Sequence, residues 1–268
     1  LNSFHGRTLF TVSVGGQPKY SKDYAPLPAG ITHVPFNDVA ALEATISDKT
    51  CAVIIEPIQG ESGILPATQE YLQAARRLCD KHGALLILDE VQTGMGHTGK
   101  LFAYEHYGVT PDILSSAKAL GGGFPIGAIL TTDKIAPTFG PGTHGSTFGG
   151  NPMACAVGSR AFDIINAPET LAHVEQQGQK LQTALRELGK KTGVFKEVRG
   201  MGLLLGCVLA DKYAGKASEI TAAALKHGLM VLVAGANVVR FAPSLLLNDE
   251  DMAEGLKRFE AALAEWLA

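Results

Sequence analysis

Long apolar runs alternate with stretches of helical periodicity through the first half of the chain. Residues 84–91 form a continuous apolar run, which predicts a central strand that is buried on both faces. Residues 68–82 have helical spacing, and Thr68 is suited to cap the start of this helix and Gly83 to end it. Further strands are expected at residues 51–56, 113–116 and 128–132. The alternation predicts an α/β domain with a mostly parallel sheet.

The pattern changes beyond residue 151. Long helical stretches cover residues 153–166 and 169–190, a shorter helix is expected at 216–227, and a last one begins near Asn248. Strand-like runs lie among them, at residues 194–198, 202–208, 230–233 and 238–241. This mixture is typical of an α+β unit. We therefore predict a large domain over residues 1–166 and a small C-terminal domain over residues 167–268.

Composition and charge narrow the class of protein. The 268 residues are 46% hydrophobic and only 18% charged, which is enough apolar material for a sizeable core. The formal net charge of −3 gives no electrostatic reason to expect nucleic acid or an anionic membrane as a partner. No apolar run approaches the ~20 residues of a membrane span, so the protein should be soluble, and its cysteine usage indicates a cytoplasmic protein. The four cysteines are far apart and are expected to be reduced thiols, with a zinc site as the weaker alternative.

Two charged residues follow predicted strands and together indicate cofactor chemistry. Asp89 ends the apolar run, and Lys118 lies among small and apolar residues just before the glycine run 121–123. In isolation, Asp89 would be a helix cap or an ion-pair partner, and Lys118 would be a surface lysine. Together, a carboxylate at the end of a core strand and a lysine in a tight, water-poor loop are what pyridoxal phosphate chemistry requires.

A nucleotide hydrolase is the alternative explanation of the acidic strand. Residues 94–100 have the G-x-x-x-x-G-K spacing of a phosphate loop. Leu101, however, stands where such a loop needs a Mg²⁺-binding hydroxyl. The loop also follows the acidic strand, whereas in these hydrolases it precedes that strand. Both observations disfavour the alternative.

Other polar residues lie in segments that suit anion binding. Ser146 and Thr147 stand between glycines just before a predicted helix, an arrangement that binds phosphate or simply caps the helix. Arg240 lies inside an apolar strand, where an arginine is unfavourable unless it is paired or faces a cavity. Glu56 and Glu61 are the candidates for its partner, either in a binding site or in a purely structural ion pair.

These segments, in their order along the chain, resemble the class III (subgroup II) aminotransferases, and within them the bacterial acetylornithine/succinylornithine aminotransferases. The matching segments are residues 3–8 (SFHGRT), 56–61, 89–94, the lysine loop, 144–152 and 238–243. The resemblance implies a fold type I pyridoxal-phosphate transferase with a mostly parallel large domain and an α+β small domain. The family's N-terminal third has no counterpart here, so the large domain is expected to be incomplete at its N-terminus.

The resemblance also implies a role for each site residue. Lys118 would hold pyridoxal 5′-phosphate as a Schiff base and shuttle the proton, and Asp89 would pair with the pyridinium nitrogen. The other cofactor-binding residues would be Phe4, His5, Glu90, Val91, Gln92 and Thr147. Among them, Phe4 and Val91 would enclose the ring, and Gln92 would approach the phenolic oxygen. Thr147 would bind phosphate from the partner subunit of a homodimer that shares the active site between subunits.

The substrate-binding residues implied by the resemblance are Arg7, Glu56, Glu61, Ser146 and Arg240. Arg7 would take the distal carboxylate of acylated ornithine or the side-chain carboxylate of 2-oxoglutarate, and Arg240 the α-carboxylate of glutamate. Glu61 would pair with Arg240 when the ornithine derivative is bound, so that one pocket accepts two substrates. The implied reaction moves the terminal amino group of N-acetylornithine or N-succinylornithine to 2-oxoglutarate, giving the semialdehyde and glutamate. No metal is implied.

Alternatives remain at two levels. Within the same chemistry, ornithine or 4-aminobutyrate aminotransferase is the runner-up. From a different class, the chain could be an inactive fragment that retains only dimerisation, because the missing N-terminal segment carries half of the family's phosphate cup. Two residues also depart from the family pattern: His97 replaces the usual arginine, and Ser62 replaces a glycine.

Overall fold

The computed structural model describes residues 1–268, which divide into two compact units. The first unit contains Leu1–Pro57, Ala67–Met95 and Lys100–Ala167. The second contains Pro168–Ala268 and two short segments from earlier in the chain, Ile58–Pro66 and Gly96–Gly99. Sequence analysis gave no indication that these two segments leave the first unit.

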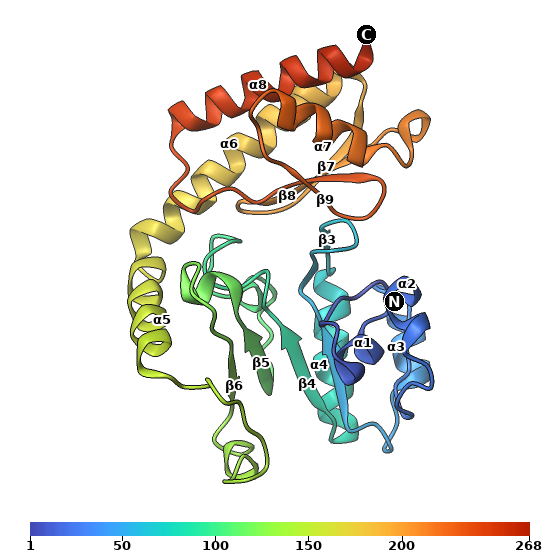
Figure 1. Ribbon diagram of the computed structural model, residues 1–268. Coiled ribbons are helices and arrows are strands. Elements are labelled where there is room, and N and C mark those ends of the chain that lie inside the picture. Colours follow the sequence, from blue (N-terminus) through green and yellow to red (C-terminus); the bar gives the residue numbers. More distant parts are fainter. The chain divides into compact units, whose positions relative to one another are not determined.

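A four-stranded sheet organises the first unit (Figure 1). Its order is β1 (Ala52–Ile55), β4 (Leu85–Asp89), β5 (Ile113–Ser116) and β6 (Ala128–Thr131). The first three strands are parallel, and β6 is antiparallel to β5. The four predicted strands are therefore present, in a mostly parallel sheet. Because β4 and β5 are parallel neighbours with Asp89 in register with Ser115, their carboxyl ends lie at the same edge.

Helix α4 (Gln69–His82) forms where the sequence predicts it and packs against β1 and β4. The Thr68 Oγ1 accepts a hydrogen bond of 3.1 Å from the backbone N of Tyr71, and Gly83 ends the helix with φ of 68°. Helix α5 (Pro152–Ile165) is capped in the same way by Asn151. The shorter elements of this unit were not predicted: α1 (Leu9–Val14), α2 (Pro18–Ser21), η1 (Lys22–Tyr24), α3 (Val39–Thr45), η2 (Ala103–Tyr107), η3 (Lys118–Gly121) and η4 (Ala136–Thr138).

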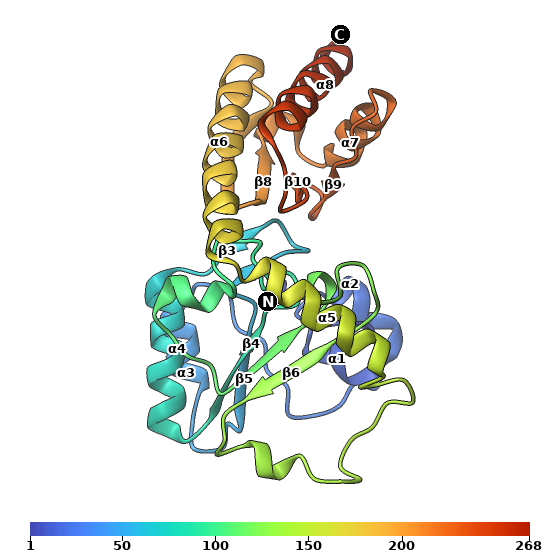
Figure 2. The same ribbon diagram turned by 90° about the vertical axis from the view of Figure 1, so that its left-hand side faces the viewer.

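The second unit has an antiparallel sheet with its helices on one face (Figure 1, Figure 2). The strand order is β7 (Phe195–Met201), β8 (Leu204–Leu209), β10 (Val238–Phe241) and β9 (Leu232–Val233). The helices are α6 (Pro168–Thr192), α7 (Ala217–Lys226) and α8 (Asp249–Leu267), with the short η5 (Asp211–Tyr213). All four strands and all three long helices lie where the sequence predicts them, with ends shifted by a few residues. None of the helices in the chain is long and apolar enough to cross a membrane.

The two faces of this sheet have different cores because side chains alternate along each strand. Val239 and Cys207 point to the helix face, where they join a cluster that includes Phe259 of α8. Val238 and Val208 point to the other face, where the hairpin of β2 (Ile58–Gln59) and β3 (Leu65–Pro66) covers them. The hairpin was not predicted from the sequence. It brings residues 58–66 onto the sheet of the second unit.

Candidate active site

Asp89 lies at the carboxyl end of β4 and is fixed by three donors. Its side chain is buried, and Oδ1 accepts hydrogen bonds from the backbone N of Val91 (3.0 Å) and from the Oγ of Ser115 (3.1 Å). The third contact joins Oδ2 to the Nδ1 of His5, at 2.6 Å. A carboxylate has about four acceptor positions, so one remains for a further donor. Asp89 is therefore a rigid, buried acceptor with unused capacity at the sheet edge.

His5 and Asp89 form a close pair within the first unit. The hydrogen bond to Asp89 raises the pKa of His5 above its usual value, and partial burial opposes that rise. The charges of Asp89 and Glu56 raise it further. The imidazolium, in contact with the Asp89 carboxylate, therefore persists to higher pH than in a free histidine.

Lys118 follows β5 and begins the short turn η3 with φ of 48°, in the left-handed region. Such a backbone is unusual for a residue with a side chain, and conformations of this kind gather at functional sites. Asp89 thus ends one strand, and Lys118 follows the end of the adjacent parallel strand at the same sheet edge. Helix α5 packs against this turn, but Lys118 itself is exposed within the chain, so the water-poor setting expected from the sequence is not provided by these residues alone.

Glu90 is buried, and its carboxylate accepts three hydrogen bonds from groups of its own unit. It accepts hydrogen bonds from the Thr93 hydroxyl (2.6 Å) and from the backbone N of Ala103 (2.8 Å) and Tyr104 (2.8 Å). Burial raises the pKa of Glu90, while these three donors lower it. The side chain joins the turn after β4 to the start of η2. Its assignment to the cofactor stays a prediction.

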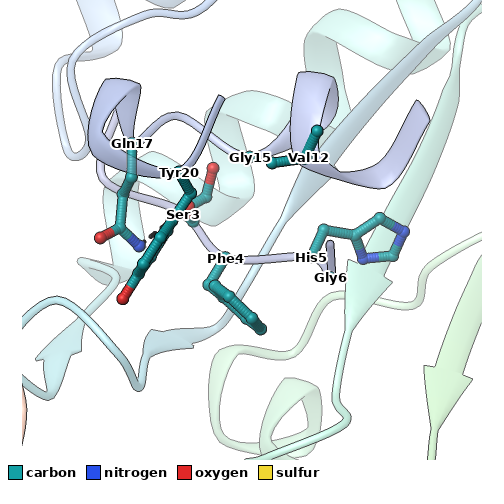
Figure 3. Close-up of a pocket in the computed structure, with 8 residues that line it drawn as sticks. All are labelled: Ser3, Phe4, His5, Gly6, Val12, Gly15, Gln17 and Tyr20. Carbon is teal, nitrogen blue, oxygen red and sulfur yellow. Dashed lines mark hydrogen bonds between the residues drawn. The ribbon is translucent and has the colours of Figure 1, made fainter. Parts of the chain in front are cut away.

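The Phe4 segment is tied to the strand that precedes the hairpin. The backbone N of Phe4 donates to the buried Glu56 Oε1 at 2.8 Å. The Phe4 ring meets the Tyr20 ring edge-on, with centroids 5.7 Å apart, and both residues line a shallow hollow that also includes His5 (Figure 3). Arg7 is exposed, with its guanidinium carbon 4.4 Å from the centroid of the Tyr20 ring. Val91 and Gln92 are half-buried in the turn after β4.

Ser146 and Thr147 are not brought to Lys118 within this chain. Because β6 is antiparallel to β5, the chain leaves the sheet at the edge opposite to the carboxyl ends of β4 and β5. Residues 141–150 then follow as an exposed segment before α5. Figure 1 shows the loop after β6 extending away from the sheet. The contribution of Thr147 from a partner subunit stays a prediction.

In the second unit, Arg240 on β10 pairs with Glu61. The Arg240 Nη1 lies 2.9 Å from Glu61 Oε1 and 3.2 Å from the carbonyl oxygen of Gly60. The exposed fractions of the two side chains are 12% and 30%. Glu61, rather than Glu56, is therefore the carboxylate that the second unit supplies to this arginine. Its partial exposure leaves the pair accessible to a competing carboxylate.

Two contacts in the structure were not predicted from the sequence. Nothing in the pattern around residues 3–8 links His5 to Asp89, which is 84 residues away in the chain. Arg199 was also not singled out, although it donates two hydrogen bonds to the carbonyl oxygen of Gly63. The only signal in the sequence was its position in a strand, since a buried or half-buried arginine requires acceptors.

Comparison with known proteins relates the whole chain to one family. The family "Aminotransferase class-III" matches residues 1–263. The acetylornithine aminotransferase of Neisseria meningitidis serogroup B is 82% identical over 268 residues, which are 100% of this chain and 67% of that protein. The crystal structure of N-acetylornithine aminotransferase from Stenotrophomonas maltophilia is 46% identical with a TM-score of 0.83, covering 90% of this chain and 64% of that one.

A more distant solved structure is also similar. The ornithine aminotransferase of Toxoplasma gondii is 32% identical with a TM-score of 0.93, covering 99% of this chain and 64% of that one. The chain thus spans about two thirds of the length of these relatives.

Proposed function

Because this chain belongs to the class-III aminotransferases and has their α/β, fold type I architecture, we propose that it transfers the terminal amino group of an N-acylornithine to 2-oxoglutarate. The products are the acylated semialdehyde and glutamate. N-Acetylornithine is the first choice of substrate, and N-succinylornithine the second. The 82% identity to an acetylornithine aminotransferase supports this choice over free ornithine or 4-aminobutyrate.

The family implies pyridoxal 5′-phosphate as the cofactor, and the residues present fit it. Asp89 retains an acceptor position on a carboxylate held by three donors, which suits a protonated ring nitrogen. When bound, the cofactor supplies an electron sink that stabilises negative charge on the substrate carbon. The observation that carries the proposal is this fixed carboxylate at the same sheet edge as the turn of Lys118.

Side chains of this protein would bind the cofactor and substrate and transfer the proton. Lys118 would attach the cofactor through its amine and, once displaced by the substrate amine, would carry the proton between carbon atoms. His5 would keep Asp89 oriented through its hydrogen bond, and Phe4, Glu90, Val91 and Gln92 would complete the cofactor contacts. Arg7 would bind the carboxylate at the far end of the substrate, with Glu56 beside it, and Ser146 of the partner subunit would lie next to the substrate.

Arg240 and Glu61 would let one site accept two substrates. Paired with Glu61, Arg240 presents no free charge, which suits an amino donor with no carboxylate at that position. Released from Glu61, Arg240 would bind the α-carboxylate of glutamate or 2-oxoglutarate through a paired, charge-assisted contact.

A homodimer that shares its active site is part of the proposal. Exposed apolar side chains of the first unit support it: Ile129 (62% exposed), Phe148 (80%) and Met153 (66%) lie on β6, on the loop before α5 and on α5 itself. Large apolar side chains exposed close together in the sequence favour a contact with another surface. In such a dimer, Thr147 of one subunit would reach the phosphate held by the other.

Two measurements test the proposal. Purified protein with added pyridoxal phosphate should develop a visible absorbance band that Lys118→Ala loses, whereas Lys134→Ala, at another exposed lysine of the first unit, keeps it. Comparison of kcat/KM for acetylornithine, succinylornithine, ornithine and 4-aminobutyrate should then favour the acylated substrates. A preference for free ornithine would overturn the choice of substrate, and no band at saturating cofactor would overturn the enzyme assignment for this chain.

A further inference from the structure

Arg199, Gly206 and Arg240 form one row across the sheet of the second unit. In the antiparallel register, Gly206 of β8 is opposite both Arg199 of β7 and Arg240 of β10. Directly opposite residues project to the same face. Val238, two residues before Arg240, belongs to the core under the hairpin, so both arginines rise on the hairpin side.

The two arginines hold the same loop at two points. Arg199 donates from Nε (3.0 Å) and from Nη2 (2.8 Å) to the carbonyl oxygen of Gly63. Arg240 donates to the Glu61 carboxylate and to the carbonyl oxygen of Gly60. One contact of the loop therefore depends on the charge of Glu61. The other depends only on the backbone, and it persists whatever Glu61 and Arg240 bind.

Ile64 fixes the loop between these two arginines. Its side chain is fully buried in the core with Ile58 and Leu204, although its φ of 50° is unfavourable for a β-branched residue. Gly206 makes this burial possible, because a Cβ there would lie 2.9 Å from the Cβ of Ile64. Such a backbone persists only where the surroundings determine it.

We propose that Arg199 is a positioning residue that keeps Glu61 within reach of Arg240 and so sets the choice between the two substrates. When Arg240 leaves Glu61 to bind a substrate carboxylate, Arg199 and Ile64 still hold the loop, and Glu61 returns to the same place. The nearest carboxylate to Arg199, Glu197, is at 3.4 Å and half-exposed, so the main contact of Arg199 is the Gly63 carbonyl. This inference rests on the proposed function of the Glu61–Arg240 pair.

The test is substrate choice in the holoenzyme with Arg199→Gln. The two half-reactions are followed separately, and kcat/KM for acetylornithine is divided by kcat/KM for glutamate. Without a positioned Glu61, Arg240 stays available to carboxylates, so the ratio should fall by roughly fivefold or more, the lower range of coupling between sites. Arg199→Lys, which keeps a charge but not the paired donors, should give an intermediate ratio.

Two controls separate positioning from general stability. Arg186→Gln removes another arginine that donates to a backbone carbonyl, that of Val198, without touching the loop, and it should leave the ratio unchanged. The double variant Arg199→Gln/Glu61→Gln should have the ratio of Glu61→Gln alone, because both changes act through one pair. An equal loss in both half-reactions, or additive effects in the double variant, would overturn the proposal.

A second readout does not depend on substrate. Amide hydrogen exchange of residues 60–64 in the substrate-free holoenzyme should become at least roughly tenfold faster in Arg199→Gln, since exchange follows local opening. Unchanged exchange would also overturn the proposal. If the wild-type enzyme prefers another amine over acetylornithine, that amine replaces it in the ratio. The proposed function would then fail in its substrate while the role of Arg199 is still decided.

Discussion

His5 and Asp89 form a hydrogen-bonded pair at 2.6 Å between the Nδ1 and Oδ2 atoms, linking the N-terminal segment to the end of the central strand. Asp89 is buried, whereas His5 is half-buried, so the pair lies just inside the surface of the first unit. This contact explains two features together. It holds the segment that carries Phe4 against the sheet, and it gives the carboxylate a cationic neighbour.

The first prediction concerns the pH dependence of this pair. The pKa of His5 is raised in the folded chain, so its stabilising contribution is complete below the unfolded value near 6.5 and is lost as pH rises through the raised value. Replacement by His5→Gln should therefore lower the free energy of unfolding by about 2 kcal/mol at pH 5.5. The loss should be clearly smaller at pH 9. Urea unfolding of both proteins at the two pH values measures the difference.

The matched control is His82→Gln, which removes a histidine paired at 2.7 Å with the exposed Asp48. An exposed carboxylate is screened by water, so this substitution should have less effect at pH 5.5 than His5→Gln. Equal effects of the two substitutions, or a His5→Gln effect that grows with pH, would contradict the interpretation.

The second prediction separates cofactor attachment from chemistry. Asp89→Asn keeps the size of the side chain but removes the charge that would hold the ring nitrogen protonated. The absorbance band of bound cofactor should persist, while the single-turnover rate with acetylornithine falls by at least roughly a hundredfold. Asp163→Asn, an exposed aspartate on α5, is the control and should leave the rate unchanged. An unchanged rate in Asp89→Asn would remove Asp89 from its proposed role.

The elements that the sequence predicted are those with strong local signals. The apolar run of β4 is unfavourable on a surface and therefore predicts a buried strand. Thr68 and Gly83 mark the two ends of α4. The hairpin of β2 and β3 lacked such a signal, because each strand has only two residues and its stability comes from Ile58 and Ile64 packing on a sheet formed more than a hundred residues later. Local pattern does not record partners that distant in the chain.

The residues of the candidate site also differ in how far the sequence alone predicts their positions. The positions of Asp89 and Lys118 at one sheet edge could be predicted, because each comes directly after a strand that the sequence indicates. The inward direction of Glu90 could not be predicted from the residues before it, because its donors Ala103 and Tyr104 belong to a turn that begins 13 residues later. The antiparallel direction of β6 was equally hidden, because the sequence of a four-residue strand carries no record of its neighbour's direction.

The third prediction follows from the buried carboxylate of Glu90. Glu90→Ala would leave the buried backbone N–H of Ala103 and the part-buried one of Tyr104 without an acceptor, which should lower the free energy of unfolding by roughly 3 kcal/mol. Glu105→Ala, on the same turn, removes only one acceptor for the backbone N of Phe102 and should have a smaller effect. Thermal unfolding of both variants measures the two losses of stability. Equal stabilities would show that the Glu90 contacts contribute little.

The fourth prediction tests whether the exposed apolar residues of the first unit form the subunit contact. Phe148 is 80% exposed, although burying an aromatic ring of its size is strongly favourable, and exposed aromatics are typical anchors of protein interfaces. Phe148→Asp would place a charge in the contact and should weaken dimerisation by at least roughly thirtyfold, the effect of losing an anchor worth 2 kcal/mol. Sedimentation equilibrium over a dilution series measures this change.

Met230 is the matched control for Phe148, because it is also a large apolar side chain and is 82% exposed, but lies in the second unit. Met230→Asp should leave the dissociation constant unchanged if the contact is confined to the first unit. The proposed sharing of the active site adds a second expectation: as Phe148→Asp dimers dissociate on dilution, Thr147 is withdrawn from the partner's phosphate, and bound cofactor should be lost in parallel. A monomeric wild-type protein, or cofactor retention in dissociated Phe148→Asp, would contradict a site built from two subunits.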